Sequence, residues 1–276
     1  MQQYTLDFYK QSADYLLAHV PARPEIGMIL GSALGGLAEE LEDKIDIDYR
    51  DIPNFLLSTV ESHAGKMIFG TLAGKRVVAM SGRFHYYEGY SFEQLAAPVR
   101  VMKLLGVEKL IVTNAAGGIN TGYSVGDIMI IRDHINFAGV SPQRGPNVPE
   151  LGPRFFDMSK TYTPALRELA AGCAARLGQQ QRTREGVYFF FVGPHFETPS
   201  EIAAARLLGG DAAGMSTVTE ALTAGHCGMQ VLGFSLISNM AAGVLDQPIT
   251  AEEVDEAGRE ASVRFKALIR EVVKEM

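Results

Sequence analysis

Short apolar runs alternate along this chain with longer segments in which hydrophobic residues recur every three or four positions. The short runs predict buried strands over residues 26–30, 76–80, 109–113, 128–131, 187–192 and 231–237. The longer segments predict helices over residues 6–20, 37–41, 92–105, 163–177, 199–208 and 217–226, and from residue 250 onward. Because strands and helices take turns, the pattern predicts an α/β fold with a largely parallel sheet.

Apolar residues are spread evenly over all 276 positions, with no linker and no internal repeat. That length fits one large α/β unit, and we predict a single domain over residues 1–276. Residues 137–156 are rich in Pro and Gly and show no periodicity. A loop of this length in a compact domain usually serves a binding site or an interface.

Composition and charge exclude some classes of binding partner for this chain. The net charge of −7 and the pI near 5.4 argue against nucleic acid or an anionic membrane as a partner, because no basic stripe or tail is present. No apolar run approaches the roughly 20 residues that cross a bilayer, and the first residues lack the features of a signal peptide. Two cysteines, Cys173 and Cys227, make no disulfide framework. We therefore expect a reducing, cytoplasmic setting.

Small and polar residues follow most of the predicted strands. In parallel sheets, ligands bind beyond the carboxyl ends of the strands, so these positions are the first candidates for a site. They are Gly31 with Ser32, the segment 81–85 with Arg83 and His85, the segment 114–117, the segment 195–197 with Glu197, and Ser238 with Asn239.

Three elements suit an oxyanion. Ser32 lies in the glycine-rich turn 31–36 at a predicted helix N-terminus, where backbone N–H groups favour negative charge, although a purely structural turn fits that segment equally well. Arg83 offers a forked donor, and His85 points to the same side of an extended segment. Taken alone, that pair also fits a surface arginine and a core histidine. Ser216 precedes a predicted helix, and the three elements together predict one phosphate site.

Two further residues offer hydrogen-bonding groups to a ligand. Glu197 stands between Phe196 and a Thr-Pro pair, and its carboxylate only accepts hydrogen bonds, so it suits a ring that bears N–H donors. Asn239 carries both a donor and an acceptor. Either residue, taken alone, fits an ordinary turn as well.

Other chemistries lack their defining pattern. The turn 31–36 is neither Gly-x-Gly-x-x-Gly nor a Walker A loop, and the segment 70–75 only approaches the latter. Ser124 matches Gly-x-Ser-x-Gly but precedes a strand, whereas a nucleophile elbow needs a strand, a turn and a helix in that order. The six histidines show no metal-ligand spacing, so we predict no metal site and expect core or capping roles for His134 and His226.

Several short motifs also follow one another in an order that is typical of a known family. They are Gly-Ser at 31–32, Ser-Thr-Val at 58–60 with His-Ala-Gly at 63–65, Gly-Arg-Phe-His-Tyr-Tyr-Glu-Gly at 82–89, Thr-Asn-Ala-Ala-Gly-Gly at 113–118, Gly-Asp-Ile at 126–128, Arg-Asp-His-Ile-Asn at 132–136, Phe-Glu-Thr at 196–198, Gly-Met-Ser-Thr-Val at 214–218 and Ser-Asn-Met-Ala-Ala-Gly at 238–243. Over nearly its whole length the chain resembles the trimeric, low-molecular-mass purine nucleoside phosphorylases. The Asn-Met-Ala-Ala-Gly run is similar to their bacterial branch.

The resemblance implies a homotrimer of single α/β domains, each with a central twisted mixed β-sheet flanked by helices. It implies a reaction without cofactor or metal, in which inorganic phosphate is a co-substrate. Catalytic roles then belong to Asn239, Glu197 and His85. Phosphate binding belongs to Ser32, His63, Arg83, His85, Ala115 and Ser216. Purine and ribose binding belong to Tyr87, Phe155, Phe196, Glu197, Met215 and Asn239, with Phe155 reaching into a neighbouring subunit.

The implied reaction is phosphorolysis of purine nucleosides to a free base and ribose 1-phosphate. Asn239 would donate to N7 and Glu197 would accept from N1–H, which predicts a preference for 6-oxopurines. An Asp at position 239 would instead suit adenine, as in the related methylthioadenosine phosphorylases, and that activity is the alternative. Three positions depart from the family pattern: Ala251, where a histidine usually contacts the 5′-hydroxyl, His195 and Thr219. Acceptance of xanthosine and the choice between ribose and deoxyribose stay open.

Overall fold

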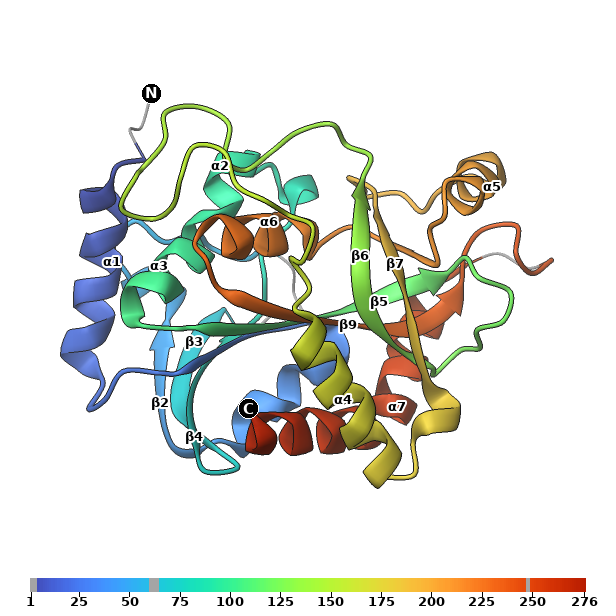
Figure 1. Cartoon of the computed structure of the whole chain (residues 1–276), viewed down its shortest axis with the longest axis horizontal. Helices are drawn as coiled ribbons and strands as arrows, with labels where there is room; N and C mark the ends of the chain where they lie inside the picture. Colours follow the sequence, from blue (N-terminus) through green and yellow to red (C-terminus); the bar gives the residue numbers. More distant parts are fainter. Residues whose placement is uncertain (1–3, 60–64, 247–248) are drawn as a thin grey trace.

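The computed structural model describes residues 4–59, 65–246 and 249–276, without the side chains of residues 32–33 and 251–255. Within these residues the chain forms nine strands that belong to one hydrogen-bonded sheet (Figure 1). The strands are β1 (Ile26–Leu30), β2 (Glu42–Asp48), β3 (Lys66–Leu72), β4 (Lys75–Ser81), β5 (Lys109–Gly118), β6 (Ile128–Asn136), β7 (Thr183–Phe190), β8 (Ala212–Gly214) and β9 (Gln230–Met240).

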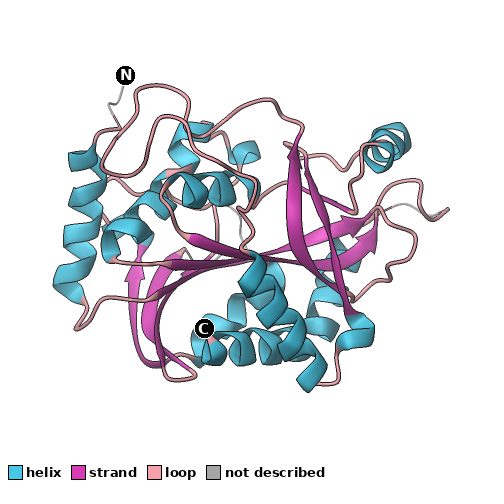
Figure 2. Cartoon of the chain, viewed as in Figure 1, coloured by secondary structure: helices cyan, strands magenta, loops and turns pink. Residues whose placement is uncertain are grey.

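Helices cover both faces of the sheet (Figure 2). The α-helices are α1 (Leu6–His19), α2 (Phe92–Leu95), α3 (Ala97–Leu105), α4 (Pro164–Arg176), α5 (Pro199–Leu207), α6 (Val218–His226) and α7 (Ala251–Glu275). Short 3₁₀ segments are η1 (Ser32–Glu40), η2 (Tyr49–Asp51), η3 (Tyr86–Glu88) and η4 (Gln180–Arg182). Helices α1, α3 and α6 pack on one face, and α4 and α7 pack on the other. None of the described helices has the length and apolar character needed to span a membrane.

The central strands are apolar on both faces because helices cover both sides. In β4, Val78 and Met80 belong to the core that also contains residues of α1 and α3. Val77 and Ala79 belong to the core beneath α7. Successive side chains of a strand point to opposite faces, so an unbroken apolar run is what such a strand requires.

The sheet is mixed and partly closed on itself. Strands β1, β4, β5 and β9 are parallel to one another, so their carboxyl ends open on the same edge. Beyond β5 the order continues through β8, β7, β6 and β9, and β9 pairs again with β5. These five strands therefore form a closed ring, which fixes the positions of the strand ends around it.

Each predicted strand is present, but the sheet is less parallel than the alternation predicts. Three further strands, β2, β3 and β8, were not predicted, and β2–β3, β3–β4, β5–β8 and β6–β9 pair antiparallel. Most residues of β2 are exposed and charged, so its sequence lacks an apolar run. The glycine-rich segment 70–75 belongs to the β3–β4 hairpin, where Ala73 and Gly74 have φ of +50° and +82°, as a tight two-residue hairpin turn requires.

Two other predictions need correction. The helix predicted over residues 92–105 is divided at Ala96, because Pro98 cannot donate to the carbonyl one turn earlier and instead lies in the first turn of a new helix, α3. Strands β5 and β9 extend through residues 118 and 240, so the candidate polar positions Asn114 and Asn239 lie within strand ends instead of after them.

Candidate active site

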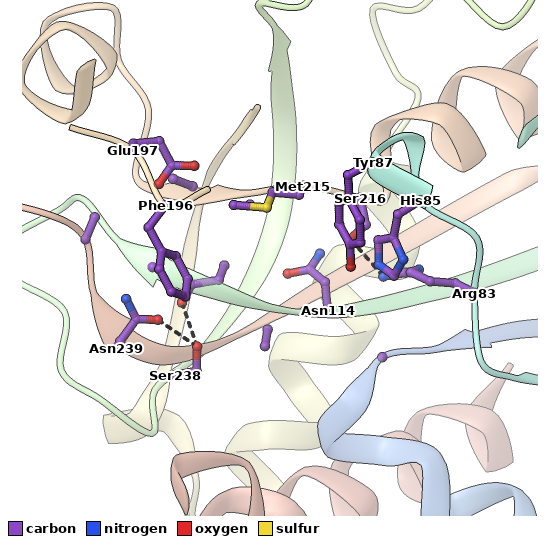
Figure 3. A pocket seen from close by; sticks show the side chains of 17 residues that line it. Arg83, His85, Tyr87, Asn114, Phe196, Glu197, Met215, Ser216, Ser238 and Asn239 are labelled. Atoms are coloured by element: carbon purple, nitrogen blue, oxygen red, sulfur yellow. Dashed lines mark hydrogen bonds between the residues drawn. The ribbon is translucent and has the colours of Figure 1, made fainter. Parts of the chain in front are cut away.

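A cavity of about 210 Å³ lies where the parallel strands β1, β4, β5 and β9 end. Figure 3 shows its side chains in two groups, with Asn114 and Met215 between them. The first group, the anion end, contains Arg83, His85, Tyr87 and Ser216. The second group, the base end, contains Phe196, Glu197, Ser238 and Asn239.

Arg83, which follows β4, is only 2% exposed and is held from several sides. Its Nε donates to Glu220 Oε1 at 3.1 Å. Its Nη1 donates to the carbonyl of Thr113 at 2.7 Å and to Ser216 Oγ at 3.0 Å. A buried ion pair with additional hydrogen bonds fixes the guanidinium. Its Nη2 is buried without a hydrogen-bond partner in the described chain, so this nitrogen is a donor that no described group uses.

Close approach of two strands shapes the wall of the anion end. The backbone N–H of Gly31 donates to Thr113 Oγ1 at 2.9 Å. A Cβ at position 31 would lie 2.8 Å from the carbonyl oxygen of Thr113, so only glycine fits there. On the other side, the N–H of Ser216 donates to the hydroxyl of Tyr188 at 3.2 Å. Both contacts fix the backbone at Gly31 and Ser216 beside the cavity, and neither contact fills the cavity itself.

His85 is oriented by a neighbouring carboxylate. Glu88 Oε1 accepts from the N–H of His85 at 2.7 Å and lies 3.0 Å from its Nδ1. The imidazole also stacks on Tyr87, with ring centroids 4.6 Å apart. Burial raises the pKa of Tyr87 to about 12, so its phenol stays protonated. The arrangement presents an aromatic wall and a fixed imidazole to the cavity.

Glu197 lies at the base end, in the loop between β7 and α5. A capping box between Thr198 and Glu201 fixes the start of α5 directly after it. Glu197 Oε1 is buried without a hydrogen-bond partner in the described chain, and burial raises the pKa of its carboxyl. A buried acceptor without a donor is costly, so this oxygen suits a ligand N–H. Phe196, which is 45% exposed, supplies an apolar surface beside it.

Asn239 faces the cavity from β9 and is 7% exposed. Ser238 Oγ donates to Asn239 Oδ1 at 2.9 Å, and Asn239 Nδ2 donates to the carbonyl of Met240 at 3.1 Å. This network assigns the orientation of the amide. Because an NH₂ group carries two N–H bonds, Asn239 retains one donor for a ring nitrogen of a ligand.

A model of the phosphorylase superfamily matches residues 25–274. Purine nucleoside phosphorylase 1 of Geobacillus stearothermophilus is 55% identical over 267 residues, which cover 97% of this chain and 97% of that protein. The chain belongs to the purine nucleoside phosphorylase family. It is an enzyme, and its reaction is the phosphorolysis of purine nucleosides.

Solved phosphorylases have the same fold. The structure of a schistosoma purine nucleoside phosphorylase with hypoxanthine has a TM-score of 0.95 and 40% identity, and covers 100% of this chain and 99% of that one. The Schistosoma mansoni enzyme with adenosine has a TM-score of 0.94 and 40% identity, and covers 99% of this chain and 98% of that one. These comparisons confirm the predicted α/β fold and the predicted family.

The phosphorylase cavity brings together most of the predicted site residues. Those that line it are Arg83, His85, Tyr87, Ala115, Phe196, Glu197, Met215, Ser216 and Asn239. The side chain of Ser32 and the whole of His63 lie outside the described residues. Phe155 is not among the lining residues of the described chain, and it is 89% exposed. Its predicted role depends on a second subunit.

Three residues that support this phosphorylase site were not predicted. Glu88 holds His85, and Glu220 holds Arg83. Thr217 lies 3.4 Å from the same arginine and accepts from Asn114 at 2.8 Å. The position of Glu88 three residues after His85 is a usable capping signal. Glu220 carries no such signal, because its partner is 137 positions away.

The two histidines expected in structural roles have structural partners. The Nδ1 of His134 lies 3.1 Å from the hydroxyl of Tyr162, and Nε2 of His226 lies 3.1 Å from Asn147 Oδ1. Burial lowers the pKa of both imidazoles, which favours their neutral forms. His226 is buried and His134 is partly buried, and both positions fit the core or capping roles predicted for them.

Proposed function

We propose that this phosphorylase acts on 6-oxopurine nucleosides, inosine and guanosine, with ribose or deoxyribose as the sugar. The observation that carries the proposal is the base end of the cavity, where a buried carboxylate oxygen and an amide donor face one space. The proposed products are the free purine base and (deoxy)ribose 1-phosphate, as in purine salvage. Neither a metal nor an organic cofactor takes part, because phosphate itself is the nucleophile.

The proposed phosphate lies at the anion end. Arg83 Nη2, Ser216 and His85 bind its oxygens, with the backbone at Ala115 nearby, and the family resemblance adds Ser32 and His63. The C1′–N9 bond of the nucleoside breaks and its electron pair leaves with the purine, while a phosphate oxygen forms the new bond to C1′. The dianion stabilises the positive charge that develops on the sugar, and fixed donors hold it in place. Tyr87 and Met215 contact the ribose.

At the base end, Asn239 and Glu197 act on the purine, which stacks against Phe196. The amide of Asn239 donates to N7 as negative charge develops on the leaving base. The unpaired oxygen of Glu197 accepts from N1–H of a 6-oxopurine, which relieves the cost of an unpaired buried acceptor. Because the pKa of this carboxyl is raised by burial, we expect base recognition to weaken in mild acid.

Adenosine is the alternative substrate, and 5′-methylthioadenosine is its close relative. A relative with this fold has been solved with adenosine, so the cavity shape alone does not exclude it. Adenine has an acceptor at N1, and a charged Glu197 would then face a lone pair. Sites built on hydrogen bonds discriminate mispaired analogues by roughly 10⁴, so Glu197 together with Asn239 supports the 6-oxopurine assignment.

The proposed assembly is a homotrimer in the cytoplasm. Phe155 is 89% exposed and Phe137 is 63% exposed, and both belong to the long irregular stretch over residues 137–156. An exposed phenylalanine in such a loop suits an apolar pocket on another molecule. The family resemblance directs Phe155 into the site of a neighbouring subunit, beside the ribose.

The test is a substrate panel with and without phosphate. We expect phosphate-dependent release of hypoxanthine from inosine and of guanine from guanosine, at a kcat/KM at least about 10²-fold above that for adenosine. Absence of phosphate dependence would contradict the reaction. Equal kcat/KM values for inosine and adenosine would contradict the 6-oxopurine assignment and favour the alternative.

A further inference from the structure

Thr217 has a backbone conformation that its residue type rarely adopts. Its φ is +71°, and the residue is fully buried. The other described non-glycine residues with positive φ are Asp43, Asn54 and Ala73, none of which is buried or β-branched. A β-branched residue with φ in this range is strained and persists only where its surroundings enforce it.

The strained residue is the centre of a tight γ-turn. The N–H of Val218 donates to the carbonyl of Ser216 at 2.7 Å across Thr217, and φ of +71° with ψ of −41° is close to the rare form of this turn. The chain reverses here between the end of β8 and the start of α6. The turn therefore places Ser216 against the anion end while Thr217 lies behind it.

The hydroxyl of Thr217 joins residues from three segments. Its Oγ1 accepts from Asn114 Nδ2 at 2.8 Å, lies 3.4 Å from Arg83 Nη1 and lies 3.3 Å from Ser216 Oγ. Asn114, Arg83 and Ser216 all line the cavity, whereas Thr217 is not among its lining residues. One oxygen behind the wall thus contacts three side chains that form the wall.

The pattern of donors determines where the protons lie. Among the described atoms that contact Thr217 Oγ1, Asn114 Nδ2 and Arg83 Nη1 carry only N–H donors, so Ser216 Oγ is the contact that can accept the proton of this buried hydroxyl. Ser216 Oγ then accepts from Thr217 and also from Arg83 Nη1 at 3.0 Å. Both of its acceptor sites are filled, so the proton of Ser216 points into the cavity.

We propose that Thr217 is a positioning residue that orients the Ser216 hydroxyl as a donor to the phosphate co-substrate. The inference rests on the proposed roles of Ser216 and Arg83 in phosphate binding. A phosphate dianion offers only acceptors, so a hydroxyl helps only when its proton faces the anion. The γ-turn and the Asn114 contact hold Thr217 in the one geometry that achieves this.

The test compares variants at Thr217 with a matched threonine in α6, the helix that follows it. Thr217→Val keeps the β-branched shape and removes the hydroxyl, whereas Thr217→Ser keeps the hydroxyl. Thr223→Val is the control, because Thr223 is also fully buried but its hydroxyl contacts Thr219 and Gln143. For each protein, the KM for phosphate, the KM for inosine and the melting temperature are measured.

We expect Thr217→Val to raise the phosphate KM about tenfold, which corresponds to about 1.4 kcal/mol, with less than a twofold change in the inosine KM. Thr217→Ser and Thr223→Val should stay within about threefold of the wild-type phosphate KM. If Thr217→Val does not fold, Thr217→Gly replaces it, because glycine accepts φ of +71° and also lacks the hydroxyl. Wild-type values in Thr217→Val or Thr217→Gly, or equal changes in both KM values, would overturn the assignment.

A double variant shows whether Thr217 acts through Ser216. In a Ser216→Ala background, Thr217→Val should change the phosphate KM by less than twofold, because the hydroxyl that it orients is already absent. A further tenfold rise in that background would refute the proposed route. If the wild-type enzyme shows no phosphate-dependent turnover, that result contradicts the proposed function, and this inference fails with it.

Discussion

Glu88 offers the sharpest test of how the site is held. Its side chain is only 2% exposed. Its two carboxylate oxygens accept four hydrogen bonds, from the N–H and ring of His85 and from the N–H and hydroxyl of Thr59, over 2.7–3.0 Å. Glu88→Gln keeps the shape but turns one acceptor into an NH₂ group that would face donors. The substitution therefore removes two of the four bonds while leaving the packing intact.

The magnitude follows from the pKa of the carboxyl. Burial by itself would raise the pKa of Glu88, but the hydrogen bonds from His85 and Thr59 outweigh burial and lower it from 4.5 to about 2. A difference of that size between unfolded and folded chains corresponds to about 3 kcal/mol of stability. This contribution is complete above the unfolded pKa and is lost as the pH falls toward the folded value. About 2 kcal/mol of it disappears by pH 3.

The assay is urea unfolding of the wild type and of Glu88→Gln between pH 7 and pH 3. We expect the variant to be less stable by about 2–3 kcal/mol at pH 7, and the gap should shrink steadily below pH 4.5. Glu168→Gln, on the exposed side of α4, serves as control and should change stability by less than about 0.5 kcal/mol. A gap that is absent at pH 7, or that does not change with pH, would refute this account of Glu88.

Three other substitutions probe the two ends of the cavity and the subunit contact. Asn239→Asp should raise the ratio of adenosine to inosine kcat/KM by at least about tenfold, because a carboxylate can accept from the 6-amino group; an unchanged ratio would count against the role of Asn239. Arg83→Ala should raise the KM for phosphate by about 10²-fold and the KM for inosine far less, as measured by steady-state titration of each substrate. The reverse pattern would contradict the phosphate-binding role of Arg83. Phe155→Ala should raise the inosine KM about tenfold and leave the phosphate KM unchanged. Gel filtration checks that the oligomer persists. Wild-type kinetics would contradict the proposed role of Phe155 in the site of a neighbouring subunit.

Local pattern accounts for the elements that the sequence predicted well. The run over residues 26–30 is apolar at every position except its glycine, and it forms the fully buried strand β1. By contrast, β2 is an edge strand with mostly exposed charged residues, and β8 has only three residues. Neither contains enough buried positions to produce a periodic signal, because burial of an edge or of a short strand depends on what packs against it.

The chemistry of the site was readable from residues near strand ends because parallel strands present those ends together. The sequence alone therefore named Arg83, Glu197 and Asn239 as members of one site. It did not name Glu220 or Thr217, whose contacts with Arg83 cross more than a hundred positions.

By itself, then, the sequence determined most of the elements, the family and the identity of most groups that line the cavity, since these depend on local pattern and on residue type. Tertiary structure alone decided that β9 returns to β5 to close the ring, that Glu220 pairs with Arg83, and that Thr217 lies behind Ser216. The first two contacts join segments far apart in the chain, and the third depends on the turn at Thr217, which Asn114 and Arg83 contact from distant segments. Their geometry depends on the path of the whole backbone, and this path determines in which direction a hydroxyl proton or a guanidinium nitrogen points.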